Sequence, residues 1–62
     1  MVNKVFEVGQ HYKSDVNGKI FEVEYIKTNL DGKKLVGFKH EKTGEVYDVN
    51  LRIAQMMLLT KI

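Results

Sequence analysis

The chain has 62 residues and a formal net charge of +2, and it contains no cysteine, proline or tryptophan. A chain of this length has room for one small core, so we expect residues 1–62 to form a single domain. The lack of cysteine excludes disulfide bonds and cysteine-based zinc sites. With 44% hydrophobic and 29% charged residues, the composition is that of a folded globular domain and not of a disordered chain.

Neither end of the chain carries a signal for export or membrane insertion. The first ten residues lack the long apolar run and the cleavage site of a signal peptide. The apolar segment 51–62 is shorter than the roughly 20 residues that a bilayer crossing needs, and Arg52 and Lys61 interrupt it. We therefore expect a cytoplasmic protein that makes no contact with a membrane.

The clearest pattern lies between Gly18 and Asn50, where apolar and polar residues alternate. Such alternation is typical of half-buried antiparallel strands. It predicts strands at 20–28, 35–40 and 45–49. Predicted turns precede them at 15–18, 29–33 and 41–44, with Asn-Gly, Asp-Gly and Thr-Gly as their reversing residues.

The period of two assigns the side chains of these strands to faces. The residues expected to face the core are Phe21, Val23, Tyr25, Val36, Phe38, Tyr47 and Val49. Ile26 is expected to face the other way. Gly37, inside a strand, predicts a bulge, a sharp bend or the close approach of another backbone.

A short strand at 10–14, with Tyr12 at its centre, is predicted before these three. Two interpretations are open for the preceding segment, Val2 to Gly9. Phe6 and Val8 fall on one face of a strand, or the segment is an apolar lead-in that packs over one end of the molecule.

After Asn50 the apolar period becomes helical. We expect a single helical or 3₁₀ turn at 51–55, capped by Asp48 or Asn50. A last strand at 57–61 would then pair with the first strand. A continuous helix to Thr60 is the alternative.

Five short strands with a helical turn before the last predict a mainly β fold, a small and partly open antiparallel barrel. The chain resembles the small SH3-like barrels, especially uncharacterised ones of bacterial and phage origin. The resemblance rests on the succession VGQHYKS, NGKIFEVEYI, KLVGFKH, TGEVYDV and LRIAQMMLL. It implies the fold and no particular function. Proline-rich peptides are not expected as ligands, because the chain lacks tryptophan and an acidic cluster after 35–40.

The sequence offers no catalytic or metal-binding constellation, so we expect no enzyme, no cofactor and no small-molecule substrate. A structural zinc site needs about four ligands. His11 and His40 would have to be joined by Asp48 or Glu22, and nothing in the spacing favours that set. The Ser14–Asp15 pair near His11 lacks the positioned base and the polarising pocket that a nucleophile requires.

The excess of positive charge lies after residue 33, where five basic residues face three acidic ones. The candidate nucleic-acid contacts are Lys33, Lys34, Lys39, Lys42 and Tyr12. Lysines would contact phosphates, and an exposed tyrosine would stack on a base. Lysines also protect the edges of sheets from aggregation, and that interpretation stays open.

Four consecutive apolar residues, Met56 to Leu59, cannot all face one small core. Met56, Met57 and Leu59 are the candidate protein interface, because exposed apolar patches mark interaction sites. The first hypothesis is a non-enzymatic interaction module that docks an unknown protein partner or itself. The alternative is a barrel that binds nucleic acid weakly, mainly through electrostatic attraction.

Overall fold

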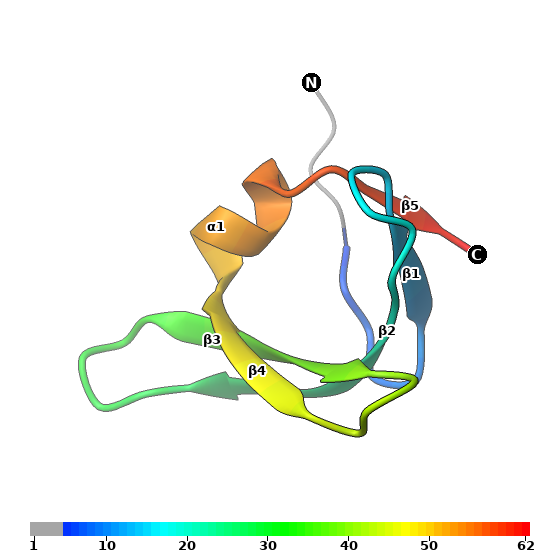
Figure 1. Ribbon diagram of the computed structural model, residues 1–62. Helices are drawn as coiled ribbons and strands as arrows, with labels where there is room; N and C mark the ends of the chain where they lie inside the picture. The colour runs from blue at the N-terminus through cyan, green and yellow to red at the C-terminus, as the bar shows by residue number, and fades with distance from the viewer. Residues whose placement is uncertain (1–4) are drawn as a thin grey trace.

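The computed structural model describes residues 5–62, and its five antiparallel strands form one strongly curved sheet (Figure 1). The elements in chain order are β1 (His11–Ser14), β2 (Ile20–Thr28), β3 (Lys34–His40), β4 (Val46–Asn50), α1 (Leu51–Met56) and β5 (Leu59–Lys61). The strand order is β4-β3-β2-β1-β5, so the last strand pairs with the first. The predicted mainly β fold, with a helical turn before the last strand, is confirmed.

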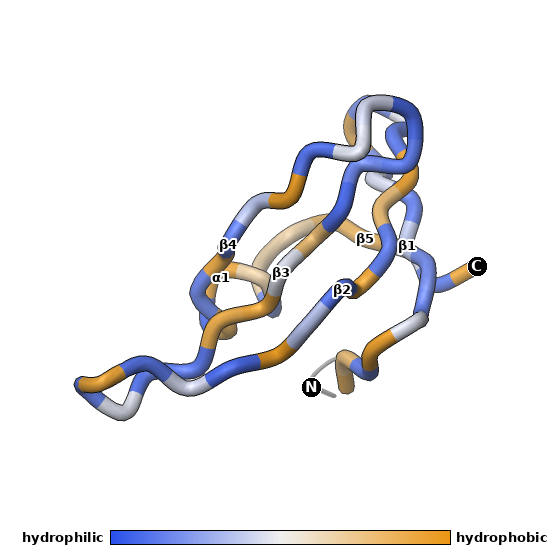
Figure 2. Tube along the Cα trace, turned by 90° about the horizontal axis from the view of Figure 1, so that it is seen from below, coloured by the Kyte–Doolittle hydropathy of each residue, from blue (hydrophilic) through white to orange (hydrophobic). Residues whose placement is uncertain are grey.

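The sheet bends around the core without meeting itself, and β4 and β5 are its two ends. Among residues 5–62, no helix has the length and apolarity that crossing a membrane would require. The turn between β2 and β3 projects away from the rest of the molecule, and it is mostly hydrophilic (Figures 1 and 2). This turn therefore adds little to the core.

The tight turns lie where the sequence predicts them. Gly18 precedes β2 with a φ of 73°, and Gly44 ends the β3–β4 turn with a φ of 76°. Residues with a β carbon rarely adopt such angles, so glycine is needed at both positions. In the first turn the Asn17 side-chain oxygen accepts a hydrogen bond of 3.0 Å from the Lys19 backbone N–H. This contact fixes the path of the chain into β2.

The core is small and rich in aromatic rings. Its buried apolar residues are Phe6, Tyr12, Val23, Val36, Phe38, Ala54 and Leu59. Phe6 lies before β1 and packs its ring 5.2 Å from that of Tyr12 and 5.6 Å from that of Phe38. Val8 is 65% exposed. The lead-in interpretation is therefore correct for residues 5–9, while Val2 lies outside the described residues.

A β-bulge in β2 overturns one prediction. Val23 pairs with Phe38, but the next aligned pair is Tyr25 with Gly37, which leaves Glu24 as the extra residue. Directly paired residues lie on the same face of a sheet. Because Gly37 alternates with the buried Phe38, Tyr25 lies on the outer face, and its predicted place beside Val23 is wrong.

The same bulge reverses the assignment of Ile26. This residue pairs with the fully buried Val36, which places Ile26 on the inner face of the sheet. The outer face was expected because the sequence pattern assumes that side chains alternate between the two faces at every residue of β2. An extra residue shifts that count by one and exchanges the faces of all residues after it.

The Tyr25 ring covers Gly37 closely. A β carbon built at Gly37 would lie 2.5 Å from the ring, which is closer than any real contact. The Lys27 ammonium lies 5.0 Å from the centroid of the same ring and 3.7 Å from an Asp48 carboxylate oxygen. An aromatic ring packed over a strand glycine shields the exposed backbone and stabilises the strand pair. The close approach that Gly37 predicted is therefore made by a side chain.

Tyr25→Ala is expected to lower the free energy of unfolding by about 1 kcal/mol, the upper range for a cross-strand pair. In a Gly37→Ala background the added methyl group has already displaced the ring, so the same change should cost less. Urea denaturation of the four proteins measures this difference. Equal costs in the two backgrounds would show that the ring does not act through Gly37.

Candidate functional site

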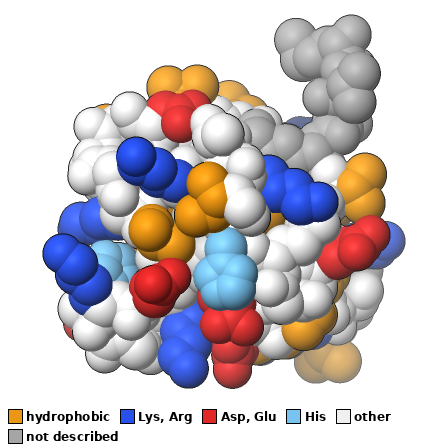
Figure 3. All heavy atoms as spheres, turned by 90° about the vertical axis from the view of Figure 1, so that its right-hand side faces the viewer, with side chains coloured by type: hydrophobic (Ala, Val, Ile, Leu, Met, Phe, Trp, Pro, Cys, Tyr) orange, Lys and Arg blue, Asp and Glu red, His pale blue; other side chains and the backbone are white. Residues whose placement is uncertain are grey.

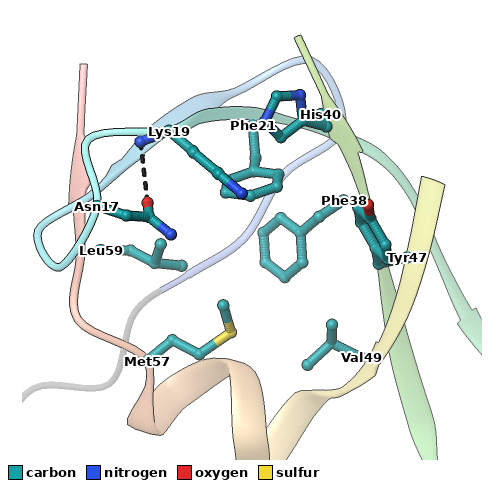
Figure 4. A pocket seen from close by; sticks show the side chains of 9 residues that line it. All are labelled: Asn17, Lys19, Phe21, Phe38, His40, Tyr47, Val49, Met57 and Leu59. Carbon is teal, nitrogen blue, oxygen red and sulfur yellow. Dashed lines mark hydrogen bonds between the residues drawn. The ribbon is translucent and has the colours of Figure 1, made fainter. Parts of the chain in front are cut away.

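A pocket lies where the sheet fails to close, between its two end strands (Figure 4). We call it the open-edge pocket. Its volume is about 260 Å³, and its lining residues are Asn17, Lys19, Phe21, Phe38, His40, Tyr47, Val49, Met57 and Leu59. Strands β2, β3 and β4 supply one wall, while β5, Met57 and the β1–β2 turn supply the other.

The interior of the open-edge pocket is the surface of the core itself. Phe38 and Leu59 are among the buried core residues, and Phe21 and Met57 pack against them. The rings of Phe21 and Phe38 meet edge to face with 6.3 Å between their centroids. A pocket with such walls gains free energy by burying an apolar group, because the water at these surfaces is released.

Tyr47 forms the rim of the pocket. It pairs with Phe38, so it lies on the inner face as expected, but it is 46% exposed. Its exposure follows from the position of β4 at the end of the sheet, where no further strand covers it. The Tyr47 hydroxyl donates a 2.8 Å hydrogen bond to Glu45 Oε2. This bond, together with the negative charge of the carboxylate, raises the pKa of Tyr47 above its usual 10.0.

Three polar side chains stand around the mouth of the pocket. Asn17 and Lys19 come from the β1–β2 turn, and Figure 4 shows both side chains reaching over the apolar wall. His40, at the end of β3, is 8% exposed and packs its ring edge to face on Phe21 at 5.2 Å. Among residues 5–62, no acidic residue lines the pocket. The mouth therefore combines one full positive charge with polar groups.

A second depression adjoins this mouth and shares Asn17, Lys19 and His40 with it. Its further lining residues are Gly18, Ile20, Glu41 and Lys42, and its volume is about 340 Å³. Here a carboxylate and an ammonium group occur together, so the local charges balance. The unbalanced charge of the region is that of Lys19.

The predicted protein interface is divided by the structure. The chain leaves α1 in an extended conformation, so successive side chains alternate between outside and inside. Met56 is 76% exposed, Met57 is partly buried in the open-edge pocket, and Leu59 is 8% exposed. Met57 and Leu59 therefore act together in the pocket, and Met56 does not belong to that site.

The predicted nucleic-acid contacts do not form one surface. Lys33 and Lys34 line a depression of about 470 Å³ together with Arg52. Lys42 belongs to the turn at the opposite end of β3, in the depression beside the open-edge pocket. Lys39 lies between Glu22 and Val46 in the sheet register. Lys33 and Lys34 therefore gather with Arg52, whereas the depression that holds Lys42 also holds the carboxylate of Glu41.

Tyr12 cannot serve as a stacking platform. It is 3% exposed, and its hydroxyl donates a 2.9 Å hydrogen bond to Gln10 Oε1. Burial also raises its pKa, with a smaller contribution from the charge of Glu7. Tyr12, the one tyrosine that the sequence pattern did not assign to the core, is therefore a core residue. Its place in the candidate set for nucleic-acid contact is therefore not supported by the geometry.

The outer face formed by β1, β2 and β5 carries both signs of charge. Figure 3 shows lysine, acidic and histidine side chains interspersed on that side of the molecule. His11 Nε2 lies 3.9 Å from a Glu22 carboxylate oxygen, and this pair is on the face opposite to His40. Within residues 5–62, no three side chains of the metal-binding types gather in a suitable arrangement.

No protein family model matches the chain, and no curated protein and no solved structure matches it either. The resemblance to SH3-like barrels therefore stays a prediction drawn from the succession of strands and turns.

Sequence reasoning did not single out the polar residues at the pocket mouth. Asn17 is predicted only as part of the turn at 15–18, and Lys19 lies between that turn and the next strand with no predicted role. His40 is considered only for a zinc site that the spacing does not favour. The sequence did contain a signal for this site. In an antiparallel sheet the turn before β2 and the turn before β4 lie at the same end, because β3 runs back between these two strands. The predicted turns at 15–18 and 41–44 therefore place Asn17 near His40.

Glu45→Ala is expected to return the pKa of Tyr47 toward its usual value of 10.0, because it removes both the hydrogen bond and the charge that favour the neutral phenol. A pH titration of the tyrosine ¹³Cζ resonances measures the shift. Tyr12 is the internal control, since burial is the main cause of its raised pKa. A Tyr47 pKa that does not move would contradict the hydrogen bond.

Proposed function

We propose that the protein is a non-enzymatic interaction module, an SH3-like barrel that docks an extended segment of a protein partner in the open-edge pocket. The observation that carries this proposal is the position of the pocket. An apolar cavity walled by core side chains lies directly beside β4, a strand with a hydrogen-bonded neighbour on one side only within the described residues.

The backbone of β4 is suited to receive such a segment. His40 N–H donates to Glu45 C=O at 2.7 Å, which sets the alternation of the β3–β4 ladder. In an antiparallel ladder the bonding direction alternates along the strand, so the N–H and C=O groups of Val46 and Asp48 point to the free side. A segment that pairs with this edge forms main-chain hydrogen bonds with β4, and its side chains can enter the open-edge pocket.

The lining of the pocket supports a binding role over catalysis. As far as the described residues go, it contains no serine, threonine, cysteine, aspartate or glutamate. Covalent and acid–base mechanisms need a nucleophile beside a base, or two groups that exchange protons. The titratable side chains of the lining are Lys19, His40 and Tyr47, and the hydroxyl of Tyr47 is engaged with Glu45.

Two neighbouring methionines provide a matched test of the docking site. Peptides selected from a random library against the protein are expected to shift the ¹³C-methyl resonance of Met57 and to leave that of Met56 in place. Met57→Gln should weaken their binding about tenfold, because a polar amide replaces an apolar wall. Met56→Gln should leave the affinity unchanged, since Met56 is exposed outside the pocket.

Equal effects of the two substitutions would contradict the proposed site. A second copy of the chain is the other partner to test, by light scattering. A mass above that of the 7.2 kDa monomer, lowered by Met57→Gln and not by Met56→Gln, would identify the docked segment as part of this chain.

Binding of nucleic acid is a second candidate function, and one observation favours it. Lys33, Lys34 and Arg52 line one depression, and no acidic residue of the described part of the chain lines it. Three neighbouring cations attract phosphate groups and release counterions when they bind them. No exposed aromatic ring lines this depression, so the interaction would be electrostatic and without base stacking.

Two charge-reversed double variants separate this candidate from a general effect of net charge. The double variant Lys34→Glu with Arg52→Glu should be retained less on a heparin column. The slope of log affinity against log salt concentration should become shallower by about two. Lys39→Glu with Lys42→Glu changes the net charge by the same amount and should reduce retention less. Equal losses in the two variants would show that the depression is not a binding site.

A further inference from the structure

The polar groups at the mouth of the open-edge pocket are all available as hydrogen-bond donors. The Asn17 oxygen already accepts from the Lys19 backbone, which leaves the side-chain NH₂ group unused. Lys19 Nζ is a donor only. His40 Nδ1 accepts a 3.2 Å hydrogen bond from the Thr43 backbone N–H, so the ring proton resides on Nε2. Two donors from the β1–β2 turn and one from the end of β3 therefore lie at the mouth of one apolar cavity.

Among residues 5–62, no carboxylate lines the cavity to pair with these donors. Glu41 belongs to the adjoining depression with Lys42, and the Glu45 carboxylate accepts from Tyr47. The missing group is consequently an anionic acceptor supplied by the ligand. A carboxylate fits, because it accepts several hydrogen bonds and pairs with the ammonium group of Lys19.

The carboxylate must lie close to the apolar group that fills the pocket, since the donors stand at its mouth (Figure 4). In an extended segment the side chain next to an apolar anchor points to the opposite face, and the following one lies about 7 Å along the strand. An α-carboxylate shares its Cα with the side chain of the same residue. It is therefore the carboxylate nearest to the anchor.

We propose that the docked segment is the C-terminus of the partner, with the side chain of an apolar last residue in the pocket and its α-carboxylate bound by Asn17, Lys19 and His40. This inference rests on the proposed docking function and specifies its ligand. The walls select the apolar side chain, and the donors select a free chain end over an internal peptide bond.

N-acetyl-L-phenylalanine and its primary amide are the probes, because they differ only in the charged acceptor. Titrations followed at the Met57 methyl and His40 imidazole resonances are expected to give an affinity at least tenfold higher for the acid. Lys19→Gln should bring the acid to within about threefold of the amide and leave the amide unchanged. Lys33→Gln, which removes the same charge at the β2–β3 turn, should have no effect.

Equal affinities of acid and amide, with Met57 shifted by both, would overturn the C-terminal inference and leave the docking function standing. Equal effects of Lys19→Gln and Lys33→Gln would overturn it as well, because the preference would then reflect net charge. If neither probe shifts Met57, the inference fails. The proposed docking function is contradicted as well only if the peptides selected from the library also leave the Met57 methyl resonance in place.

Discussion

One antiparallel sheet must enclose the whole core of this protein, and the rest of the structure follows from that constraint. Val23, Val36 and Phe38 lie on the concave side of β2 and β3, and each is at most 2% exposed. The sheet reaches around them by strong twist and by the bulge at Glu24. Phe6, from the segment before β1, and Ala54, from α1, cover the sides that the strands leave open.

Five short strands are not enough to complete the enclosure. The sheet stops at β4 on one side and at β5 on the other, and core side chains stay visible between them. A gap of this kind exposes apolar surface that a larger barrel would cover. Here the gap is bordered by hydrogen-bond donors, by an adaptable methionine and by a strand that, within the described residues, is paired on one side only. These features are typical of binding sites.

The order of the elements could be predicted from the sequence because each depends on local chemistry. Asn-Gly, Asp-Gly and Thr-Gly define the reversals, alternation defines the strands, and the change of period after Asn50 defines the helix. What could not be predicted depends on neighbours in space. The exposure of Tyr47 follows from the place of β4 at the end of the sheet.

The tyrosines show why a regular period is not sufficient. The pattern treats β2 as uninterrupted, so it cannot register the bulge that moves Tyr25 to the outer face over Gly37. The pattern also does not show how exposed the Tyr12 side chain is. Its short strand lies between β2 and β5, and the Phe6 ring packs against Tyr12. A side chain assigned to the wrong face is also given the wrong exposure to solvent. The choice of candidate site residues is then wrong as well, because only an accessible side chain can contact a partner.

Strand and helix share one residue at the end of β4, with no loop between them. Asn50 closes β4 and at the same time caps α1, its side-chain oxygen accepting a 2.9 Å hydrogen bond from the Arg52 N–H. Because no loop separates β4 from α1, the place of β4 fixes where the helix begins. Val49, just before this junction, and Met57, just after the helix, both line the open-edge pocket, so a single six-residue helix sets the spacing of its two walls.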